Sequence, residues 1–142
     1  VTGNTVVWKP SHLVPETSQA VAKIVMHALR ETAARWNVTV PASIFSMVQG
    51  DADAGDTIVR HPAIRTISFT GSKSVGDEVG ALAEGLGKCA MKECAGINLF
   101  YVHASANIER AAKNFVYGKT ITSGQRCTSI QEVLCDDPTK DL

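Results

Sequence analysis

The sequence predicts an α/β fold in which a mostly parallel sheet is covered by helices on both faces. Short runs of β-branched and aromatic residues alternate with longer segments whose apolar residues recur every three or four positions. This alternation is typical of strand–helix–strand units. The 142 residues match the size of one typical domain, and 44% apolar with 20% charged residues is ordinary for a globular protein.

The first half of the chain contains two expected strands and two expected helices. We expect a strand at Thr5–Trp8, which ends at Lys9–Pro10. Pro15 then opens a helix that reaches about Trp36. The apolar face of this helix comprises Val21, Ile24, Val25, Ala28, Leu29 and Thr32. A second strand is expected at Ile44–Val48, and a short helix at Asp56–Arg60 before His-Pro breaks it.

The second half continues the alternation. We expect a helix from Ser74 to about Leu86, and another that Asn107 caps and that stops near Gly118. Gly124 marks a turn. The remaining strands are expected at Ile64–Phe69, Cys89–Cys94, Asn98–Val102 and Ile130–Cys135. Both ends of the chain lie close to an expected strand, which is unusual for a complete domain.

Charge and hydropathy exclude several classes of partner. Fourteen basic residues balance fourteen acidic ones without a block of either sign, so we expect no nucleic-acid partner. No apolar run is long enough to cross a bilayer, and residues 1–7 lack the features of a signal peptide. We therefore expect no membrane partner and a cytoplasmic location.

The cysteines and histidines point to free thiols rather than to disulfides or a metal. The four cysteines are Cys89, Cys94, Cys127 and Cys135. They form no C-x-x-C pair, and a chain with this many apolar residues does not need disulfides. The histidines at positions 12, 27, 61 and 103 have no metal-ligand spacing, so we expect no metal.

Two short motifs could support chemistry at turns. Phe69–Ser72, followed by Gly76, places a small turn between a strand and a helix start, where backbone N–H groups suit an anion such as a pyrophosphate. A tight turn that Ser72 caps explains this pattern equally well. Gly124–Cys127 places a cysteine after a glycine turn and beside Arg126, which favours a reactive thiolate. The alternative is a buried cysteine that packs as a small apolar residue, and the other three cysteines fit that description.

Glu93 is a candidate general base. It lies near the end of an expected strand, where a carboxylate is costly unless it is paired or functional. The alternative is an ion pair with a lysine such as Lys92. The residue pattern alone does not distinguish these two roles.

Four motifs in order resemble the aldehyde dehydrogenase superfamily. They are the strand and lysine turn Gly3–Ser11, the turn Phe69–Ser72, the segment Glu93–Gly96 in place of Glu-Leu-Gly-Gly, and Gly124–Thr128. The separation between the glutamate and the cysteine, 127 − 93 = 34 positions, also matches the family. The resemblance covers nearly the whole chain.

The resemblance implies a fold and a domain division. It predicts a Rossmann-like parallel sheet with helices on both faces, followed by the start of a second α/β catalytic domain. Residues 1–94 would be part of the NAD(P)-binding domain, and residues 95–142 the beginning of the catalytic domain. Family members are several times longer, so the chain would be an internal piece of a protein that forms a homo-oligomer at full length.

The resemblance also implies an activity and the residues that perform it. Cys127 would attack a small-molecule aldehyde, hydride would pass to NAD or NADP, and Glu93 would activate the water that hydrolyses the thioester to a carboxylic acid. The implied cofactor-binding residues are Lys9, Ser11, His12, Gly71 and Ser72. His12 stands where many NAD-preferring members have a glutamate, which suggests the use of NADP. The alternatives are a non-catalytic nucleotide-binding or structural remnant, and a coenzyme-A-acylating semialdehyde dehydrogenase.

Overall fold

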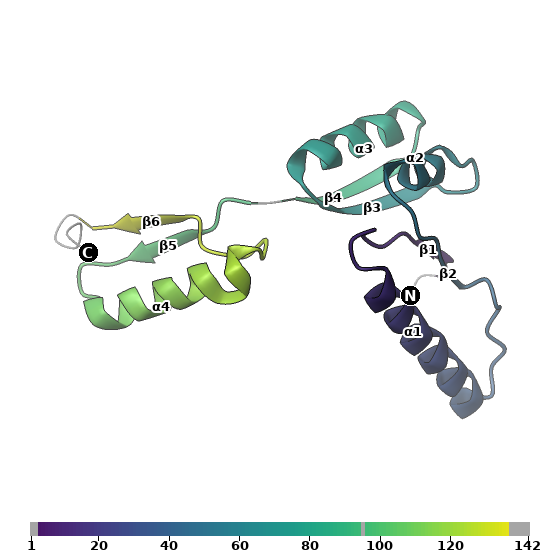
Figure 1. Ribbon diagram of the computed structural model, residues 1–142, viewed down its shortest axis with the longest axis horizontal. Helices are drawn as coiled ribbons and strands as arrows, with labels where there is room; N and C mark the ends of the chain where they lie inside the picture. Colours follow the sequence, from purple (N-terminus) through teal and green to yellow (C-terminus); the bar gives the residue numbers. More distant parts are fainter. Residues whose placement is uncertain (1–2, 95, 137–142) are drawn as a thin grey trace. The chain divides into compact units, whose positions relative to one another are not determined.

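The computed structural model describes residues 3–94 and 96–136 of the chain. Ala95 of the predicted glutamate segment, and with it the predicted domain boundary, lies outside the described residues. The elements in chain order are β1 (Val6–Trp8), α1 (Pro15–Trp36), β2 (Phe45–Met47), α2 (Ala52–Arg60), β3 (Thr66–Gly71), α3 (Lys73–Gly85), β4 (Cys89–Cys94), β5 (Leu99–Val102), α4 (Ile108–Thr120), the 3₁₀ turn η1 (Ile121–Gly124) and β6 (Glu132–Cys135) (Figure 1).

The predicted α/β class is confirmed, and the described strands form three two-stranded sheets. In the first, β1 and β2 are parallel, with Val6 opposite Phe45. In the third, β5 and β6 are parallel, with Leu99 opposite Glu132. Parallel neighbours need a long crossover, which α1 and α4 provide. The second sheet pairs β3 with β4 on either side of α3 in the sequence.

Most predicted elements occur where the sequence places them. Helix α1 and strand β4 have the predicted bounds. Asn37, in a left-handed conformation with φ of 48°, ends α1. The predicted start of α2 at Asp56 is wrong, because the helix begins at Ala52. Asp51 caps it by accepting a hydrogen bond from the Asp53 N–H at 3.2 Å.

The described residues fall into two compact units, which we describe separately. The first lies within Val1–Ile67 and Leu82–Cys89, and the second within Ser68–Ala81 and Ala90–Leu142. The buried apolar residues of the first unit are Val59, Ile67 and Ala83.

In the first unit, the Lys88 side chain caps the C-terminal end of α2. Its ammonium group donates hydrogen bonds to the carbonyl groups of Val59 and, at 2.7 Å, His61. These carbonyls lack helical partners, so the lysine satisfies them and complements the negative end of the helix dipole. The predicted apolar face of α1 is only partly covered, since Ile24 is 66% exposed.

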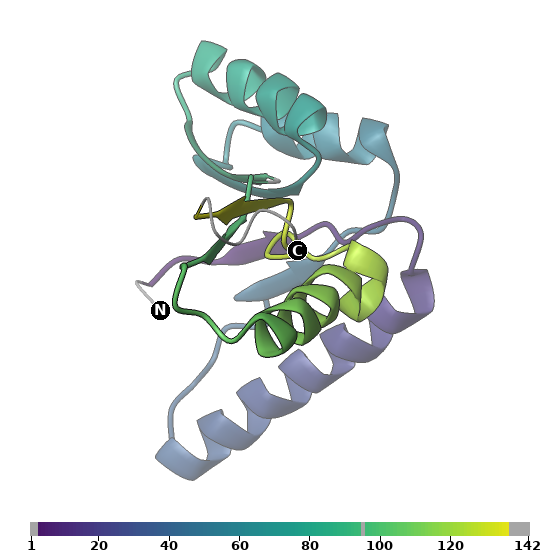
Figure 2. The ribbon, with the colours of Figure 1, turned by 90° about the vertical axis from the view of Figure 1, so that its left-hand side faces the viewer.

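The second unit is built around β5, β6 and α4. Figures 1 and 2 both show α4 beside the two strands, and the rings of Phe100 and Phe115 lie 6.1 Å apart. Val102 is its buried apolar residue. As predicted, Asn107 caps α4, accepting a hydrogen bond from the Arg110 N–H at 2.9 Å.

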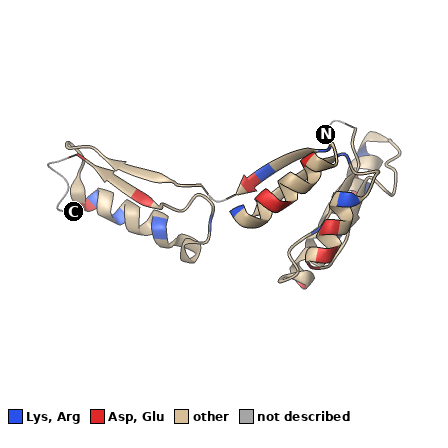
Figure 3. Ribbon diagram, turned by 90° about the horizontal axis from the view of Figure 1, so that it is seen from above, with Lys and Arg blue, Asp and Glu red and all other residues tan. Residues whose placement is uncertain are grey.

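Charged residues of both signs occur on each of the long helices α1, α3 and α4 (Figure 3). The three closest ion pairs are one helical turn apart, as between Arg60 and Asp56 at 2.7 Å. Among the described residues, no helix is long and apolar enough to span a membrane.

Candidate active site

The predicted nucleophile, Cys127, lies in an irregular turn between η1 and β6, and its side chain is exposed. Three consecutive residues before the turn have left-handed backbones: Thr122 and Ser123 with φ of 55°, and Gly124 with φ of 70°. Only the glycine adopts this conformation without steric cost. The sequence therefore tolerates backbone strain four and five residues before the cysteine, and such strain is common at functional sites.

Hydrogen bonds hold the turn on both sides of Cys127. The Ser129 N–H donates to the Arg126 carbonyl at 3.0 Å. The Asn98 side chain donates to the Cys127 carbonyl at 2.5 Å and to the Ser129 carbonyl at 3.0 Å. Asn98 was not among the predicted site residues. Its only signal was its position two residues after the glutamate segment.

Glu93 lies on β4 with its side chain exposed. The ammonium group of Lys92 pairs with Asp77 at 3.4 Å instead of with Glu93. In residues 3–94 and 96–136, Glu93 forms no ion pair and shares no hydrogen bond with Cys127. Its carboxylate is therefore available to solvent water rather than used in a structural pair.

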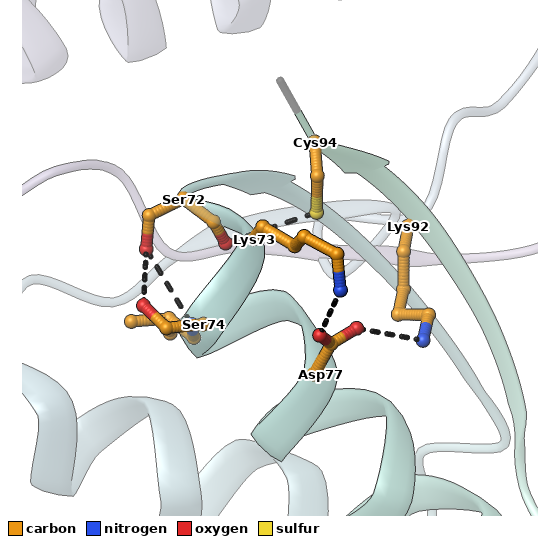
Figure 4. Close-up of polar contacts among 7 residues, drawn as sticks. Ser72, Lys73, Ser74, Asp77, Lys92 and Cys94 are labelled. Atoms are coloured by element: carbon orange, nitrogen blue, oxygen red, sulfur yellow. Dashed lines mark hydrogen bonds and ion pairs between the residues drawn. The ribbon is translucent and has the colours of Figure 1, made fainter. Parts of the chain in front are cut away.

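The predicted phosphate turn joins β3 to α3 (Figure 4). The Ser72 hydroxyl accepts a hydrogen bond from the Val75 N–H at 3.4 Å, and the Ser72 carbonyl accepts one from the Gly76 N–H at 2.9 Å. In the described part of the chain, the N–H groups of Lys73 and Ser74 have no acceptor. The turn is thus capped by Ser72, as one alternative expected, and still presents two unused donors at a helix N-terminus.

Glycines let the side chains of β4 approach α3. A Cβ atom on Gly76 would lie 2.4 Å from the Cys94 sulfur, and one on Gly80 would lie 2.7 Å from Cδ of Lys92. On the strand side, a Cβ on Gly71 would lie 2.7 Å from the Phe69 ring. A methyl group added at any of these three positions would therefore force the neighbouring side chain to shift.

An ion-pair cluster lies beside this turn, where Lys73 and Lys92 converge on Asp77 (Figure 4). The Lys73 ammonium group lies 2.5 Å from the Asp77 carboxylate. This hydrogen bond lowers the pKa of Asp77 and raises the pKa of Lys73. Two cations around one carboxylate leave a net positive charge near the unused N–H donors.

The other predicted cofactor residues lie at the carboxyl ends of β1 and β2. Lys9 donates a hydrogen bond to the Pro10 carbonyl at 3.1 Å, and its aliphatic stem contacts the Gly55 position. Ser11 and His12 are exposed and line a shallow depression of about 370 Å³. Its full lining is Pro10, Ser11, His12, Pro15, Gln49, Gly50 and Asp51. Ligands of parallel α/β sheets bind at this edge.

Residues 49–51 also line this depression and were not among the predicted site residues. Gln49 donates a hydrogen bond to the Pro15 carbonyl at 2.9 Å, so it joins the loop after β2 to the start of α1. The side chain of Asp51 caps α2 and brings a carboxylate to the same depression as His12. The helix-start signal at Asp51 could have identified it.

The predicted site residues are divided between the two units. Lys9, Ser11 and His12 belong to the first. The second contains Gly71, Ser72, Glu93 and Cys127.

The other cysteines depart from the buried role expected of them. All three lie in strands as predicted, but Cys89 is exposed, and Cys94 and Cys135 are only half-buried. The Cys94 thiol contacts the Ser72 carbonyl at 3.7 Å. Edge strands in two-stranded sheets leave such side chains accessible.

Comparison with known proteins gives matches along the whole chain. The sequence profile of the aldehyde dehydrogenase family matches residues 1–142. Lactaldehyde dehydrogenase of Methanococcus maripaludis is 35% identical over 137 residues, which are 96% of this chain and 28% of that protein. The chain spans about a quarter of the length of the curated relatives it matches.

Solved structures agree with the sequence matches. Glyceraldehyde-3-phosphate dehydrogenase GapN of Methanocaldococcus jannaschii, in complex with NADP, is 31% identical with a TM-score of 0.81, over 99% of this chain and 29% of that one. An NAD-dependent aldehyde dehydrogenase of Sinorhizobium meliloti is 30% identical with a TM-score of 0.82, over 96% and 25%. Sequence profile, relatives and solved structures agree, and the chain belongs to the aldehyde dehydrogenase family.

Proposed function

We propose that the chain carries the nucleophile and the general base of an enzyme that oxidises an aldehyde to a carboxylic acid with NAD or NADP. The observation that carries this proposal is the family match along the whole chain, together with an exposed Cys127 in a hydrogen-bonded turn. Relatives described with NADP and with NAD support both cofactors.

Each compact unit, taken by itself, offers residues that would suit one part of such a cofactor. In the first unit, Ser11 and His12 line the depression beyond β1 and β2, and Lys9 lies just before them in the chain; these three residues would hold the adenosine ribose. The turn at Gly71 and Ser72 offers unused N–H groups and a positive helix end to the pyrophosphate. When bound, the nicotinamide supplies the hydride acceptor for the oxidation.

The proposed chemistry of the protein groups begins at Cys127. Its thiolate attacks the aldehyde carbonyl carbon, a C–S bond forms, and the carbonyl electron pair moves to the oxygen. The Cys127 N–H has no acceptor in the described part of the chain, so it is free to donate to that oxygen. After hydride loss, Glu93 takes a proton from a water that attacks the resulting thioester, and the sulfur leaves.

The larger assignments follow from the same proposal. Residues 1–94 would be part of the cofactor-binding domain, and residues 95–142 the start of the catalytic domain. The substrate would be a small-molecule aldehyde. Cytoplasmic location and homo-oligomerisation of the full-length form stay predictions.

The test is aldehyde-dependent formation of reduced nicotinamide by this chain, with NAD and NADP separately. We expect Cys127→Ala to abolish the signal. Glu93→Gln should allow a single burst of reduced nicotinamide but no turnover, because the thioester forms and is not hydrolysed.

If coenzyme A restores turnover of Glu93→Gln and accelerates the unsubstituted chain, the acylating alternative holds. An absence of signal in every variant would favour the non-catalytic remnant.

A further inference from the structure

Asn98 ties the nucleophile turn to the start of the β5–β6 pair. Its side-chain amide donates to the carbonyls of Cys127 at 2.5 Å and Ser129 at 3.0 Å. Its own backbone carbonyl accepts hydrogen bonds from the N–H groups of Gln131 at 2.9 Å and Glu132 at 3.3 Å. One residue therefore makes four hydrogen bonds to the segment from Cys127 to Glu132.

Hydrogen bonds hold both peptide groups that flank Cys127, and Asn98 makes one of them. In the peptide group between Arg126 and Cys127, the Arg126 carbonyl accepts a hydrogen bond from the Ser129 N–H at 3.0 Å. In the peptide group between Cys127 and Thr128, the Cys127 carbonyl accepts a hydrogen bond from the Asn98 side chain. In a trans peptide the N–H points opposite to the carbonyl. Fixing each carbonyl therefore also fixes the N–H of the same peptide group, and the Cys127 N–H is left without an acceptor among the described residues.

The amide side chain suits this position chemically. Asparagine provides two N–H donors on one nitrogen, and both are used on two different carbonyls. Ser129 is only 2% exposed, and its hydroxyl has no partner among the described residues. Loss of Asn98 would therefore leave the Ser129 end of the turn, which water reaches poorly, short of a hydrogen bond.

We infer that Asn98 is a positioning residue that sets the nucleophile turn for oxyanion binding. The inference rests on the proposed role of Cys127. Asn98 contacts neither the thiol nor the substrate, and acts through the Cys127 and Ser129 carbonyls. Its effect should appear in reactions of Cys127 that pass through an oxyanion and should be small in those that do not.

The experiment compares two reactions of Cys127, each quantified at that residue by peptide mass spectrometry. With p-nitrophenyl acetate, the sulfur attacks the ester carbonyl, a C–S bond forms, the C–O bond to the aryl group breaks, and nitrophenolate leaves. This reaction has a tetrahedral oxyanion. With iodoacetamide, the sulfur displaces iodide without an oxyanion. The ratio of the acylation rate to the alkylation rate reports oxyanion stabilisation, and the urea-unfolded chain gives the reference ratio.

The variants are Asn98→Ala and Asn98→Asp, with Asn114→Ala on exposed α4 as the matched control. Aspartate preserves the size of the side chain but cannot donate two hydrogen bonds. The aspartate variant therefore replaces the alanine variant in the comparison if Asn98→Ala loses the helical circular dichroism of the native chain. Since a missing oxyanion donor costs a hundredfold or more in enzymes, we expect a misplaced one to lower the ratio about tenfold. Asn114→Ala should keep the native ratio.

Two results would overturn the inference. If both Asn98 variants keep the native ratio, Asn98 does not position the turn, and the role of Cys127 stands. If the unsubstituted chain has the same ratio as the urea-unfolded chain, Cys127 lacks an oxyanion site, which contradicts the proposed function and the inference together.

Discussion

Replacing Gly76 by alanine tests how tightly β4 packs on α3. The added Cβ would lie 2.4 Å from the Cys94 sulfur and 3.3 Å from the Phe69 ring. Ordinary contacts begin at 3.4 Å, so the sulfur must retreat by about 3.4 − 2.4 = 1.0 Å. Cys94 follows Glu93 directly, and the displacement therefore reaches the end of the strand that carries the proposed base.

The expected free-energy change combines two opposing effects. Overpacking costs about 1–3 kcal/mol. Alanine stabilises a helix interior relative to glycine by about 0.8–1.0 kcal/mol. We expect Gly76→Ala to lower the free energy of unfolding by about 1 kcal/mol. In a Cys94→Ala background the clash is gone, and the same substitution should raise the free energy of unfolding by up to about 1 kcal/mol.

Urea unfolding followed by far-UV circular dichroism measures these differences. Gly85→Ala is the control on the same helix, because a Cβ there would meet nothing within 4 Å. It should not destabilise the chain. If Gly76→Ala stabilises the chain as much as Gly85→Ala does, or if its effect is the same with and without Cys94, the packing argument is refuted.

Three further predictions concern charge and strain. Asp51→Asn should strengthen the binding of NADP relative to NAD severalfold, as measured by the two dissociation constants. The substitution removes a carboxylate from the depression, and asparagine keeps the helix cap. The control Asp53→Asn should leave the ratio of the two dissociation constants unchanged. Thr122→Asn should raise the free energy of unfolding, measured in urea, by about 0.5–1 kcal/mol, because asparagine tolerates φ of 55° better than a β-branched residue. An unchanged midpoint of urea unfolding would argue against backbone strain at this position. The Tyr101 hydroxyl donates to Asp136 at 2.6 Å, which raises the pKa of Tyr101 and lowers the pKa of Asp136. The stability that Tyr101 contributes should therefore be lost as pH rises through its raised pKa, and the stability that Asp136 contributes should be lost as pH falls through its lowered pKa. Hydrogen exchange of the Ala104 amide, which donates to Asp136, should show the loss at alkaline pH. Tyr101→Phe should abolish this alkaline change in exchange.

The sequence predicted the elements well where local signals were strong. Pro15 and the helical period located α1, and the asparagine at position 107 located the cap of α4. The start of α2 at Ala52 was not predicted, although Asp51 is a residue type that caps helices. Strand β3 runs to Gly71, two residues beyond its predicted end.

The candidate site was harder to predict where its contacts are non-local. Cys127 and Ser72 stand in recognisable turns, so their residue types indicated chemistry. Asn98 is 29 positions from Cys127, and no local pattern links the two. Lys92 illustrates the same limit, because its partner is Asp77 on the preceding helix rather than the adjacent glutamate.

The most direct test of the account is to identify the covalent product on Cys127. The Glu93→Gln chain would be incubated with an aldehyde and with NAD or NADP, then digested and analysed by mass spectrometry. The account predicts an acyl group on the peptide that contains Cys127, dependent on the cofactor and absent from the double variant with Cys127→Ala. An acyl group on another cysteine, or none at all while reduced nicotinamide accumulates, would contradict the assignment of Cys127 as the nucleophile.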